Sequence, residues 1–249
     1  MKVILFLVIW LRFVVAWGVN LLTGLLALLL VWPLGPERTW RLLAQRWARL
    51  VLWIERVRVD VVGEEHLATP AILIINHVSL IDAVYVPAVV PRTVKFVIKK
   101  ELGQIPLWGW ALRAAGAVLI DRKDPRGAIA SIRDAVEHLP AGWSMIVFPE
   151  GTRSRDGQLH PFKKGAFHLA IESKLPMIPL GAAGPLDIVP DGTVLIRPGP
   201  VYVTVGAPIP TAHWTIETME AHIAEARAAM AGCIEASERR RQADRGRMS

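Results

Sequence analysis

The chain has 249 residues, of which 53% are hydrophobic, with one cysteine and a formal net charge of +7. This length and apolar content exclude a disordered chain and accommodate one α/β domain with an appendage. A single cysteine, Cys233, excludes an intrachain disulfide and a cysteine-built zinc site. The basic residues are dispersed, without a zinc-finger or RNA-recognition pattern, so no nucleic-acid partner is expected. The positive charge favours an anionic partner, either a membrane surface or a phosphorylated substrate.

The first apolar segment, residues 13–34 (FVVAWGVNLLTGLLALLLVWPL), contains no charged residue. About 20 apolar residues are enough to cross a hydrocarbon core of ~30 Å. Trp32 and Pro33 stand where a cleaved signal peptide would need small residues, and a segment apolar on every face does not suit a buried soluble helix. We therefore predict membrane association, either as a spanning helix or as a re-entrant hairpin with its hinge near Gly18 and Asn20.

The next segment, residues 36–57, carries arginines and tryptophans at helical spacing. This pattern predicts an amphipathic helix at the lipid interface, with its basic side chains beside anionic head groups. The alternative is a core-packing helix whose arginines face water. Together with the apolar segment, it predicts a membrane-associated helical region over residues 1–56.

Short apolar runs alternate with helix-like segments from Val57 onward. The alternation predicts an α/β domain over 57–237, with a mixed, largely parallel sheet flanked by helices. Residues 194–205 are expected to add antiparallel strands, and 238–249 to form a loose basic C-terminal tail. The expected strands lie within 57–63, 71–76, 94–99, 116–121, 144–149 and 177–182, and the expected helices over 125–138, 163–174 and 215–237.

A histidine and a carboxylate interrupt the apolar stretch IINHVSLIDAVY, which begins at Ile74. In open α/β sheets, chemistry is found where strands end and loops begin. We expect His77 on the turn after a strand and Asp82 in the first turn of the next helix, where its carboxylate can orient the imidazole as a general base. The alternative is structural, because Ser79 and Asp82 also fit a capping box.

The second polar cluster is VFPEGTRSRDG, residues 147–157, which follows another expected strand. Its Gly151 allows close backbone approach, and the guanidinium of Arg153 offers a two-pronged donor matched to phosphate. A solvated turn with an ordinary surface ion pair is the alternative. We predict that this loop binds an anionic ligand.

Several common catalytic motifs do not occur in the sequence: the G-x-S-x-G elbow, H-E-x-x-H, the Walker A loop and G-x-G-x-x-G. The sequence thus offers a candidate base but no motif for a nucleophilic side chain. This indicates that a hydroxyl of the substrate itself is the nucleophile.

These motifs resemble those of a known family. NHVSLID (76–82) resembles the H-x4-D motif of the glycerolipid acyltransferases, and FPEGTRS (148–154) resembles their second signature, about 70 residues further on. GAVLIDR (116–122) resembles their intermediate block and LPMIP (175–179) their final proline block. The resemblance covers about 57–210 and is strongest to the bacterial 1-acylglycerol-3-phosphate acyltransferases, which are single-domain and tethered by an N-terminal helical motif.

The resemblance implies transfer of a fatty acyl group from acyl-CoA or acyl carrier protein to the free sn-2 hydroxyl of 1-acylglycerol 3-phosphate (lysophosphatidic acid), giving phosphatidic acid in phospholipid biosynthesis. It makes His77 the catalytic base and Asp82 its orienter, and it implies neither a metal nor a resident cofactor. The enzyme would act at the cytoplasmic membrane, with its active site on the cytoplasmic face, where thioester donors are found. The residues implied to bind substrate are Lys99, Arg122, Glu150, Gly151, Thr152, Arg153, Pro176 and Pro179.

Three alternatives stay open on the sequence. The acceptor could be another lysolipid, such as a lyso-ornithine lipid, or glycerol 3-phosphate, because the motif residues do not separate these. A noncatalytic membrane lipid-binding protein would be expected to have lost the base or the arginine, yet His77 and Arg153 are both present. A hydrolase using Ser79 would place its nucleophile two positions from its histidine, which is a poor geometry for proton transfer.

Overall fold

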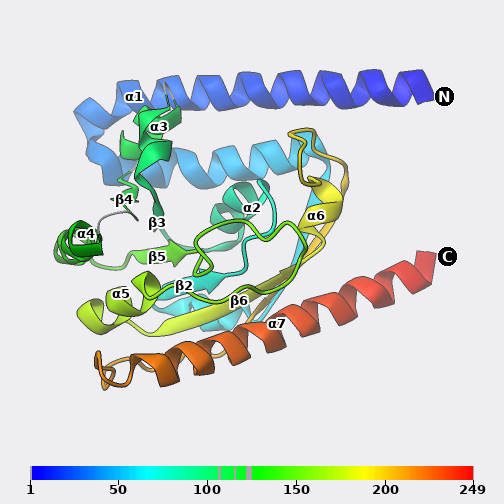
Figure 1. Ribbon diagram of the computed structural model, residues 1–249. Helices are drawn as coiled ribbons and strands as arrows, with labels where there is room; N and C mark the ends of the chain where they lie inside the picture. Colours follow the sequence, from blue (N-terminus) through cyan, green and yellow to red (C-terminus); the bar gives the residue numbers. More distant parts are fainter. Residues whose placement is uncertain (1, 106–107, 115, 122–124, 249) are drawn as a thin grey trace.

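A seven-stranded sheet forms the centre of the molecule, with helices on both faces (Figure 1). The computed structural model describes residues 2–105, 108–114, 116–121 and 125–248. The strands are β1 (Val57–Val62), β2 (Ile72–Ile75), β3 (Val94–Lys99), β4 (Val118–Ile120), β5 (Ser144–Val147), β6 (Met177–Ala183) and β7 (Gly199–Val205). The helices are α1 (Lys2–Glu55), α2 (Asp82–Val89), α3 (Trp108–Ala114), α4 (Pro125–Glu137), α5 (Gly165–Ser173), α6 (Pro185–Ile188) and α7 (Met219–Met248), with 3-10 turns η1 (Glu64–Ala68) and η2 (Lys100–Gln104).

The sheet is mixed and largely parallel, as the sequence predicts. Its strand order is β1-β7-β6-β2-β5-β3-β4, and the strands from β6 to β4 in this order all run in one direction. β7 is antiparallel to β6, and β1 is parallel to β7. All four residues of β2 are buried, as expected for a central strand covered on both faces. Because β2, β5 and β3 are neighbours and run in the same direction, their carboxyl ends lie together at one edge of the sheet.

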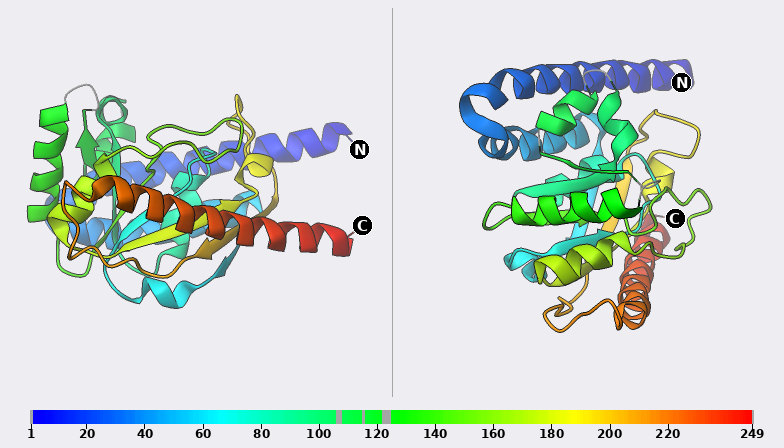
Figure 2. Two further views of the ribbon diagram at one scale, coloured as in Figure 1. Left: turned by 60° about the horizontal axis from the view of Figure 1, so that its bottom comes forward. Right: turned by 60° about the vertical axis from the view of Figure 1, so that its left-hand side comes forward.

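Two hydrophobic cores lie on opposite faces of this sheet. One includes Leu52 of α1 and Tyr85 of α2. The other includes Ile132 of α4, Phe167 of α5 and Met230 of α7. The turned views show α1 on one side of the sheet and α7 running along the other (Figure 2). Helices on both faces hold the central strands rigidly, so the loops at their ends start from fixed positions.

The expected strands over 194–205 are only partly correct. β7 begins at Gly199, and residues 194–198 lie outside the sheet. Pro198 has no N–H to give to a ladder, and the N–H of Arg197 donates instead to the carbonyl of Ile188, at 2.8 Å. The preceding segment is therefore bound to the end of α6.

α1 is a helical hairpin that turns at Gly35, whose φ of 75° and ψ of 164° lie outside the helical region. The first arm precedes Gly35 and the second arm follows it. A hydrogen bond joins the two arms: the Trp47 indole N–H donates to the Asn20 side-chain oxygen at 2.7 Å. Of the two alternatives left open by the sequence, the hairpin with a hinge near Gly18 and Asn20 does not occur, because the helix continues through both residues and turns at Gly35 instead. Residue 35 precedes Pro36, where helical backbone is disfavoured, and glycine accepts a positive φ.

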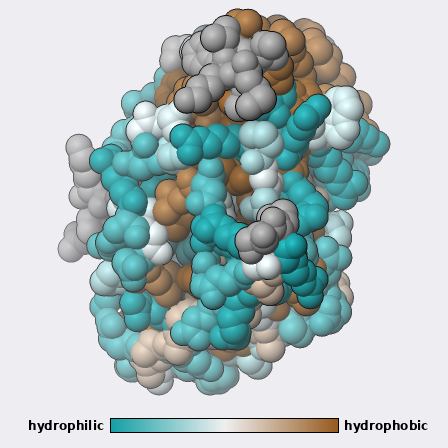
Figure 3. Space-filling model, turned by 90° about the vertical axis from the view of Figure 1, so that its right-hand side faces the viewer, coloured by the Kyte–Doolittle hydropathy of each residue, from teal (hydrophilic) through white to brown (hydrophobic). Residues whose placement is uncertain are grey.

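The first arm of α1 presents apolar side chains outward. α1 is long and apolar enough to cross a membrane, and only 6% of its most apolar 18-residue window is buried. Exposed apolar surface on this scale marks a membrane or protein contact. Figure 3 shows the hydrophobic surface above a mainly hydrophilic α/β domain. The exposed apolar side chains of this arm are those expected of a helix that contacts a membrane.

The second arm of α1 combines features of both sequence interpretations. Its Ala44, Ala48, Val51 and Leu52 are buried, Leu52 within the core that also contains Tyr85 of α2. Trp53 remains 76% exposed on its outer side. The arm is thus a core-packing helix that also presents an aromatic side chain beside the apolar first arm.

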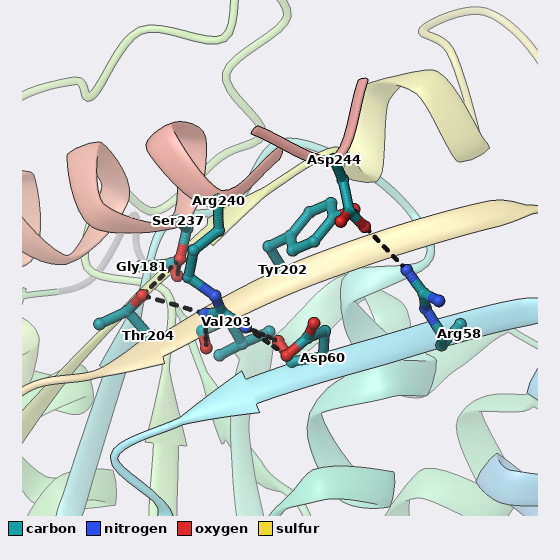
Figure 4. Close-up of polar contacts among 9 residues, drawn as sticks. All are labelled: Arg58, Asp60, Gly181, Tyr202, Val203, Thr204, Ser237, Arg240 and Asp244. Atoms are coloured by element: carbon teal, nitrogen blue, oxygen red, sulfur yellow. Dashed lines mark hydrogen bonds and ion pairs between the residues drawn. The ribbon is translucent and has the colours of Figure 1, made fainter. Parts of the chain in front are cut away.

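The C-terminal residues form a helix rather than the expected loose tail. α7 continues to Met248 and overhangs the sheet at the end of the molecule where the N-terminus also lies (Figure 1). Arg240 donates to the carbonyl of Val203 at 3.0 Å and pairs with Asp60, and Asp244 pairs with Arg58 at 3.0 Å (Figure 4). The basic tail is ordered because β1 and β7 supply its partners.

Candidate active site

Two polar segments meet at the carboxyl edge of the sheet. β2 and β5 are neighbours, with Ile74 opposite Val147, so the turn after β2 and the loop after β5 start side by side. The first carries His77 and the second carries residues 148–164. The N–H of Ser154 donates to the carbonyl of His77 at 2.7 Å. The sheet thus brings together the two motifs that are far apart in the sequence.

His77 and Asp82 form a hydrogen-bonded pair. The Nδ1 atom of His77 lies 2.8 Å from the Oδ2 atom of Asp82, whose side chain is fully buried, while the His77 side chain is 21% exposed. With Asp82 ionised, Nδ1 carries a proton and Nε2 keeps its lone pair, which suits a general base. This is the pairing that the sequence predicts.

Asp82 also closes the turn, which is the structural part of the alternative interpretation, although the Ser79 hydroxyl does not complete a capping box because it donates to the carbonyl of Val189. Its Oδ2 atom accepts the backbone N–H groups of Val78 and Ser79, each at 2.9 Å. Tyr85 lies buried next to it, and burial together with the Asp82 charge raises the pKa of the phenol. Tyr85 therefore stays neutral and adds no second negative charge. One carboxylate holds both the imidazole and the turn that carries it.

The imidazole of His77 lies flat on a neighbouring ring. It stacks on Phe148 with centroids 4.0 Å apart and an interplanar angle of 23°. The Asp82 hydrogen bond and this stacking fix the ring in two directions. The remaining nitrogen, Nε2, is held in a defined orientation at the partly open side of the turn.

Glu150 joins the two polar segments. Its side chain is almost completely buried, and its two oxygens accept the backbone N–H groups of His77 and His160, each at 2.9 Å. Burial raises the pKa of Glu150, and these two hydrogen bonds oppose the shift. Its contacts within the chain are those of a positioning residue: with Ser154, it holds both backbone polar groups of His77.

The loop after Glu150 carries the positively charged side chain of Arg153. Gly151 has a φ of 80°, a conformation that favours glycine, and its N–H donates to the carbonyl of Phe148 at 3.0 Å. Thr152 is exposed and Arg153 is half-buried. Within the described part of the chain, the Arg153 guanidinium makes neither a hydrogen bond nor an ion pair. It is available for an anionic ligand.

Asp156 organises this loop, a role that the sequence analysis missed. Its Oδ1 atom accepts the Ser154 hydroxyl at 2.8 Å and the N–H of Gln158 at 3.0 Å, and it lies 3.0 Å from Nε2 of His160. These hydrogen bonds, led by that from Ser154, lower the pKa of Asp156 to about 2. The short D-G spacing in RSRDG is the sequence signal for such a side-chain turn.

Asp156→Asn is expected to destabilise the protein at neutral pH and to have no such effect in acid. Because the folded pKa lies below the unfolded one, the stabilisation is present above about pH 4 and is lost as the pH falls toward the folded value. Urea unfolding midpoints of wild type and variant, measured from pH 7 downward, should therefore converge. A gap that stays constant with pH would contradict this assignment.

The other predicted substrate-binding residues are placed less uniformly. Lys99 ends β3 at the same edge as His77 and pairs with Glu101 at 3.2 Å. Pro179 lies within β6, opposite Ile74. The structure does not bring Pro176 to this edge: its carbonyl accepts the N–H of Ile72, at the amino ends of the strands. Arg122 lies outside the described residues.

The end of β6 and the segment that follows it support the His77 turn. The side-chain amide of Asn76 donates to the carbonyl of Ala182 at 3.1 Å, and its oxygen accepts the N–H of Ala182 at 2.8 Å. The Ser79 hydroxyl donates to the carbonyl of Val189 at 2.9 Å and is buried. Ser79 is therefore committed to the backbone, which does not suit the nucleophile of a hydrolase. Among the described residues, no group of three or more His, Cys, Asp or Glu side chains is placed to hold a metal ion.

The fold and site define an α/β enzyme in which a histidine–aspartate pair and the loop that carries Arg153 meet at the carboxyl edge of the parallel strands. The chain belongs to the acyltransferase family, whose model matches residues 58–183. This match includes His77, Asp82 and the 150–154 loop.

Characterised relatives and a solved structure agree with this assignment. The chain is 40% identical over 210 residues to a 1-acyl-sn-glycerol-3-phosphate acyltransferase of Limnanthes douglasii, covering 84% of this chain and 73% of the relative. It is 38% identical over 110 residues to the enzyme of that name from Helicobacter pylori, covering 44% and 46%. The crystal structure of the LPA acyltransferase PlsC from Thermotoga maritima has the same fold, with a TM-score of 0.76, 23% identity and coverage of 94% and 96%.

Proposed function

We propose that the protein transfers a fatty acyl group from a thioester to the sn-2 hydroxyl of 1-acylglycerol 3-phosphate, giving phosphatidic acid. The observation that carries this proposal is the His77–Asp82 pair, next to the loop in which the Arg153 guanidinium has no partner among the residues that the structure describes. The names of the relatives support the choice of acceptor. The apolar hairpin α1 suits an acceptor that resides in a lipid surface.

The chemistry needs one base and no covalent acyl-enzyme. The Nε2 atom of His77 takes the acceptor hydroxyl proton while the oxygen attacks the thioester carbonyl. The C–S bond then breaks, and the thiolate takes the proton back from the imidazolium, so that an ester and a thiol are formed. Asp82 stabilises the imidazolium through Nδ1. The thioester is a co-substrate, and no resident cofactor or metal enters the scheme.

Arg153 is assigned to the acceptor phosphate in this scheme. A guanidinium donates two parallel hydrogen bonds to phosphate oxygens, and Gly151 and Thr152 precede Arg153 in the same loop. Lys99, on the neighbouring strand β3, adds positive charge at the same edge, and Arg122 is assigned the same supporting role. Glu150 acts through the backbone of His77. Pro179 is assigned to the floor of the site, while the position of Pro176 gives it no part there.

The membrane side follows from the donor. Acyl-CoA and acyl carrier protein are cytoplasmic thioesters, so we place the enzyme on the cytoplasmic membrane with the carboxyl edge of its sheet facing the cytoplasm. The hairpin α1 would then hold the domain at the lipid surface where acceptor and product both reside.

An acceptor panel tests the proposed function. Detergent-purified protein is supplied with a long-chain acyl-CoA, or with acyl carrier protein as donor, and with 1-acylglycerol 3-phosphate, a lyso-ornithine lipid, glycerol 3-phosphate or monoacylglycerol. Mass spectrometry of the lipid products should show phosphatidic acid as the main product. Acylation of the lyso-ornithine lipid alone would replace the proposed acceptor, and binding of all acceptors without any product would favour a noncatalytic lipid-binding protein.

Arg153→Ala is expected to raise the KM for 1-acylglycerol 3-phosphate by roughly 10–100-fold, the loss of one charge-assisted hydrogen-bonded contact. Turnover of monoacylglycerol, which has no phosphate, should change little. Steady-state kinetics with both acceptors check this. Arg155→Ala is the matched control, since Arg155 is exposed and pairs with Asp191. An equal loss with both acceptors would show that Arg153 does not recognise phosphate.

A further inference from the structure

A second concave surface lies away from the His77 turn. It is a groove of about 1190 Å³ between the two arms of α1, strand β1 and the end of α2. Its walls are mainly apolar and include Val8, Leu11, Val15, Val57 and Val59. Pockets for small ligands usually span about 300–1,000 Å³. This groove therefore has room for an acyl chain as well as a head group.

Arginines give the groove a positive end. Arg49 and Arg56 both line it, and neither guanidinium forms a hydrogen bond or an ion pair within the described part of the chain. Two further arginines along the groove have an acidic neighbour: Arg58 pairs with Asp244 (Figure 4), and the charge of Arg12 lowers the pKa of the buried Glu55 against the larger, opposite effect of burial. The arginines of the groove for which no acidic neighbour is described are thus Arg49 and Arg56.

Arg56 stands at the junction of α1 and β1 in a left-handed conformation, with a φ of 55°. Glycine or asparagine is the usual residue in this conformation at a helix end, because other side chains are strained there. The turn brings the Arg56 side chain to the groove instead of continuing the helix. A glycine at this position would keep the backbone and remove only the cation.

The carboxylate of Glu64 lies far from Arg56 in the groove. Glu64, which also lines it, follows β1, whereas Arg56 precedes β1. At about 3.3 Å per residue, the strand separates the two ends by roughly 20 Å. A ligand with one anionic group would therefore place that group at the arginine end and its apolar part along β1 and the first arm of α1.

We propose that this groove binds an anionic phospholipid of the surrounding bilayer, with its phosphate at Arg49 and Arg56 and an acyl chain against α1 and β1. The groove adjoins the arm of α1 that presents apolar side chains outward, so a bilayer lipid reaches it laterally. It is separate from the catalytic turn. Ala88 and Val89, at the far end of α2, line it, while Asp82 begins α2 and does not.

Native mass spectrometry of the full chain in neutral detergent tests this proposal. Phosphatidylglycerol and phosphatidylcholine with the same acyl chains are titrated separately, and bound lipid is counted. Wild type should bind phosphatidylglycerol more tightly, and Arg56→Gly should weaken that binding roughly 10-fold or more while leaving phosphatidylcholine unchanged. The melting temperature of Arg56→Gly should equal or exceed that of wild type, since glycine accepts the left-handed backbone.

Arg38→Gln is the matched control, because Arg38 is exposed on the same arm and the variant has the same net charge. Its lipid binding should match that of wild type. An equal loss in Arg38→Gln, equal binding of the two lipids by wild type, or displacement of phosphatidylglycerol by equimolar 1-acylglycerol 3-phosphate would overturn the proposal. Acyl transfer is assayed separately, so failure of the proposed function would leave this binding result intact.

Discussion

His77→Ala is expected to lower kcat for acyl transfer by roughly 10²–10⁴-fold, the usual contribution of a positioned general base. The loss follows from the geometry, because His77 is the histidine held by a buried carboxylate at the carboxyl edge. The KM values for acceptor and donor should change little, since the imidazole takes the proton only as the hydroxyl attacks. Steady-state kinetics with thiol release as readout check both quantities.

His138→Ala is the matched control for this variant. His138 is 69% exposed at the end of α4 and pairs with Asp134, so its removal tests a histidine outside the site. Both variants should keep the wild-type melting temperature, because the His77 side chain is partly open to solvent. Activity of His77→Ala within a factor of a few of wild type would remove the proposed base.

Asp82→Asn is expected to lower kcat by roughly 10²-fold or more and to destabilise the protein as well. The amide cannot stabilise the imidazolium as the carboxylate does, and its NH₂ group cannot accept the proton on Nδ1. Asp82 also accepts the N–H groups of Val78 and Ser79. If the asparagine amide points its oxygen at these two N–H groups, it still lacks the negative charge of the carboxylate. If it points its NH₂ group at them, both N–H groups lose their hydrogen bonds, which costs about 1–3 kcal/mol of stability for each group.

The two effects of Asp82→Asn are measured separately. Thermal or urea unfolding gives the stability loss, and kcat at a temperature where the variant is fully folded gives the catalytic loss. Asp134→Asn, an exposed carboxylate paired with His138, should alter neither. A folded Asp82→Asn variant with wild-type kcat would show that Asp82 only closes the turn, as in the capping-box interpretation.

The sheet was largely predictable because its strands are short, continuous apolar runs bounded by polar or glycine residues. β2 is an example: ILII is buried throughout, and Asn76 and His77 mark its end. Pairing order was not predictable, since it depends on contacts between distant segments. β1, for instance, joins the sheet through β7 rather than through β2.

The two errors at the ends of the chain have a common cause. Gly18 and Asn20 were plausible hinges by residue type, but the surrounding run favours a continuous helix, and Asn20 instead binds Trp47 of the other arm. The basic tail appeared loose because its partners are distant in sequence. Arg241 binds Asp187, and Arg240 binds the β1 residue Asp60.

The contact between His77 and Asp82 was predictable from the sequence, and the backbone contacts that support it were not. His77 and Asp82 are five positions apart across a strand-to-helix turn, so local spacing was enough to pair them. Glu150 was predicted to contact the acceptor, whereas its oxygens hold the backbone of His77 and His160. Every residue except proline has a backbone N–H, so the residue type does not show which N–H groups a buried carboxylate will bind. Sequence patterns therefore do not reveal such contacts.

The most direct test of the central claim is thiol release from acyl-CoA by the purified protein, followed in the first turnover with and without 1-acylglycerol 3-phosphate. Direct transfer to a hydroxyl activated by His77 predicts no release without acceptor, and one phosphatidic acid formed for each thiol when the acceptor is present. A burst of thiol equal to the enzyme concentration in the absence of acceptor would show a covalent acyl-enzyme and contradict the proposed mechanism.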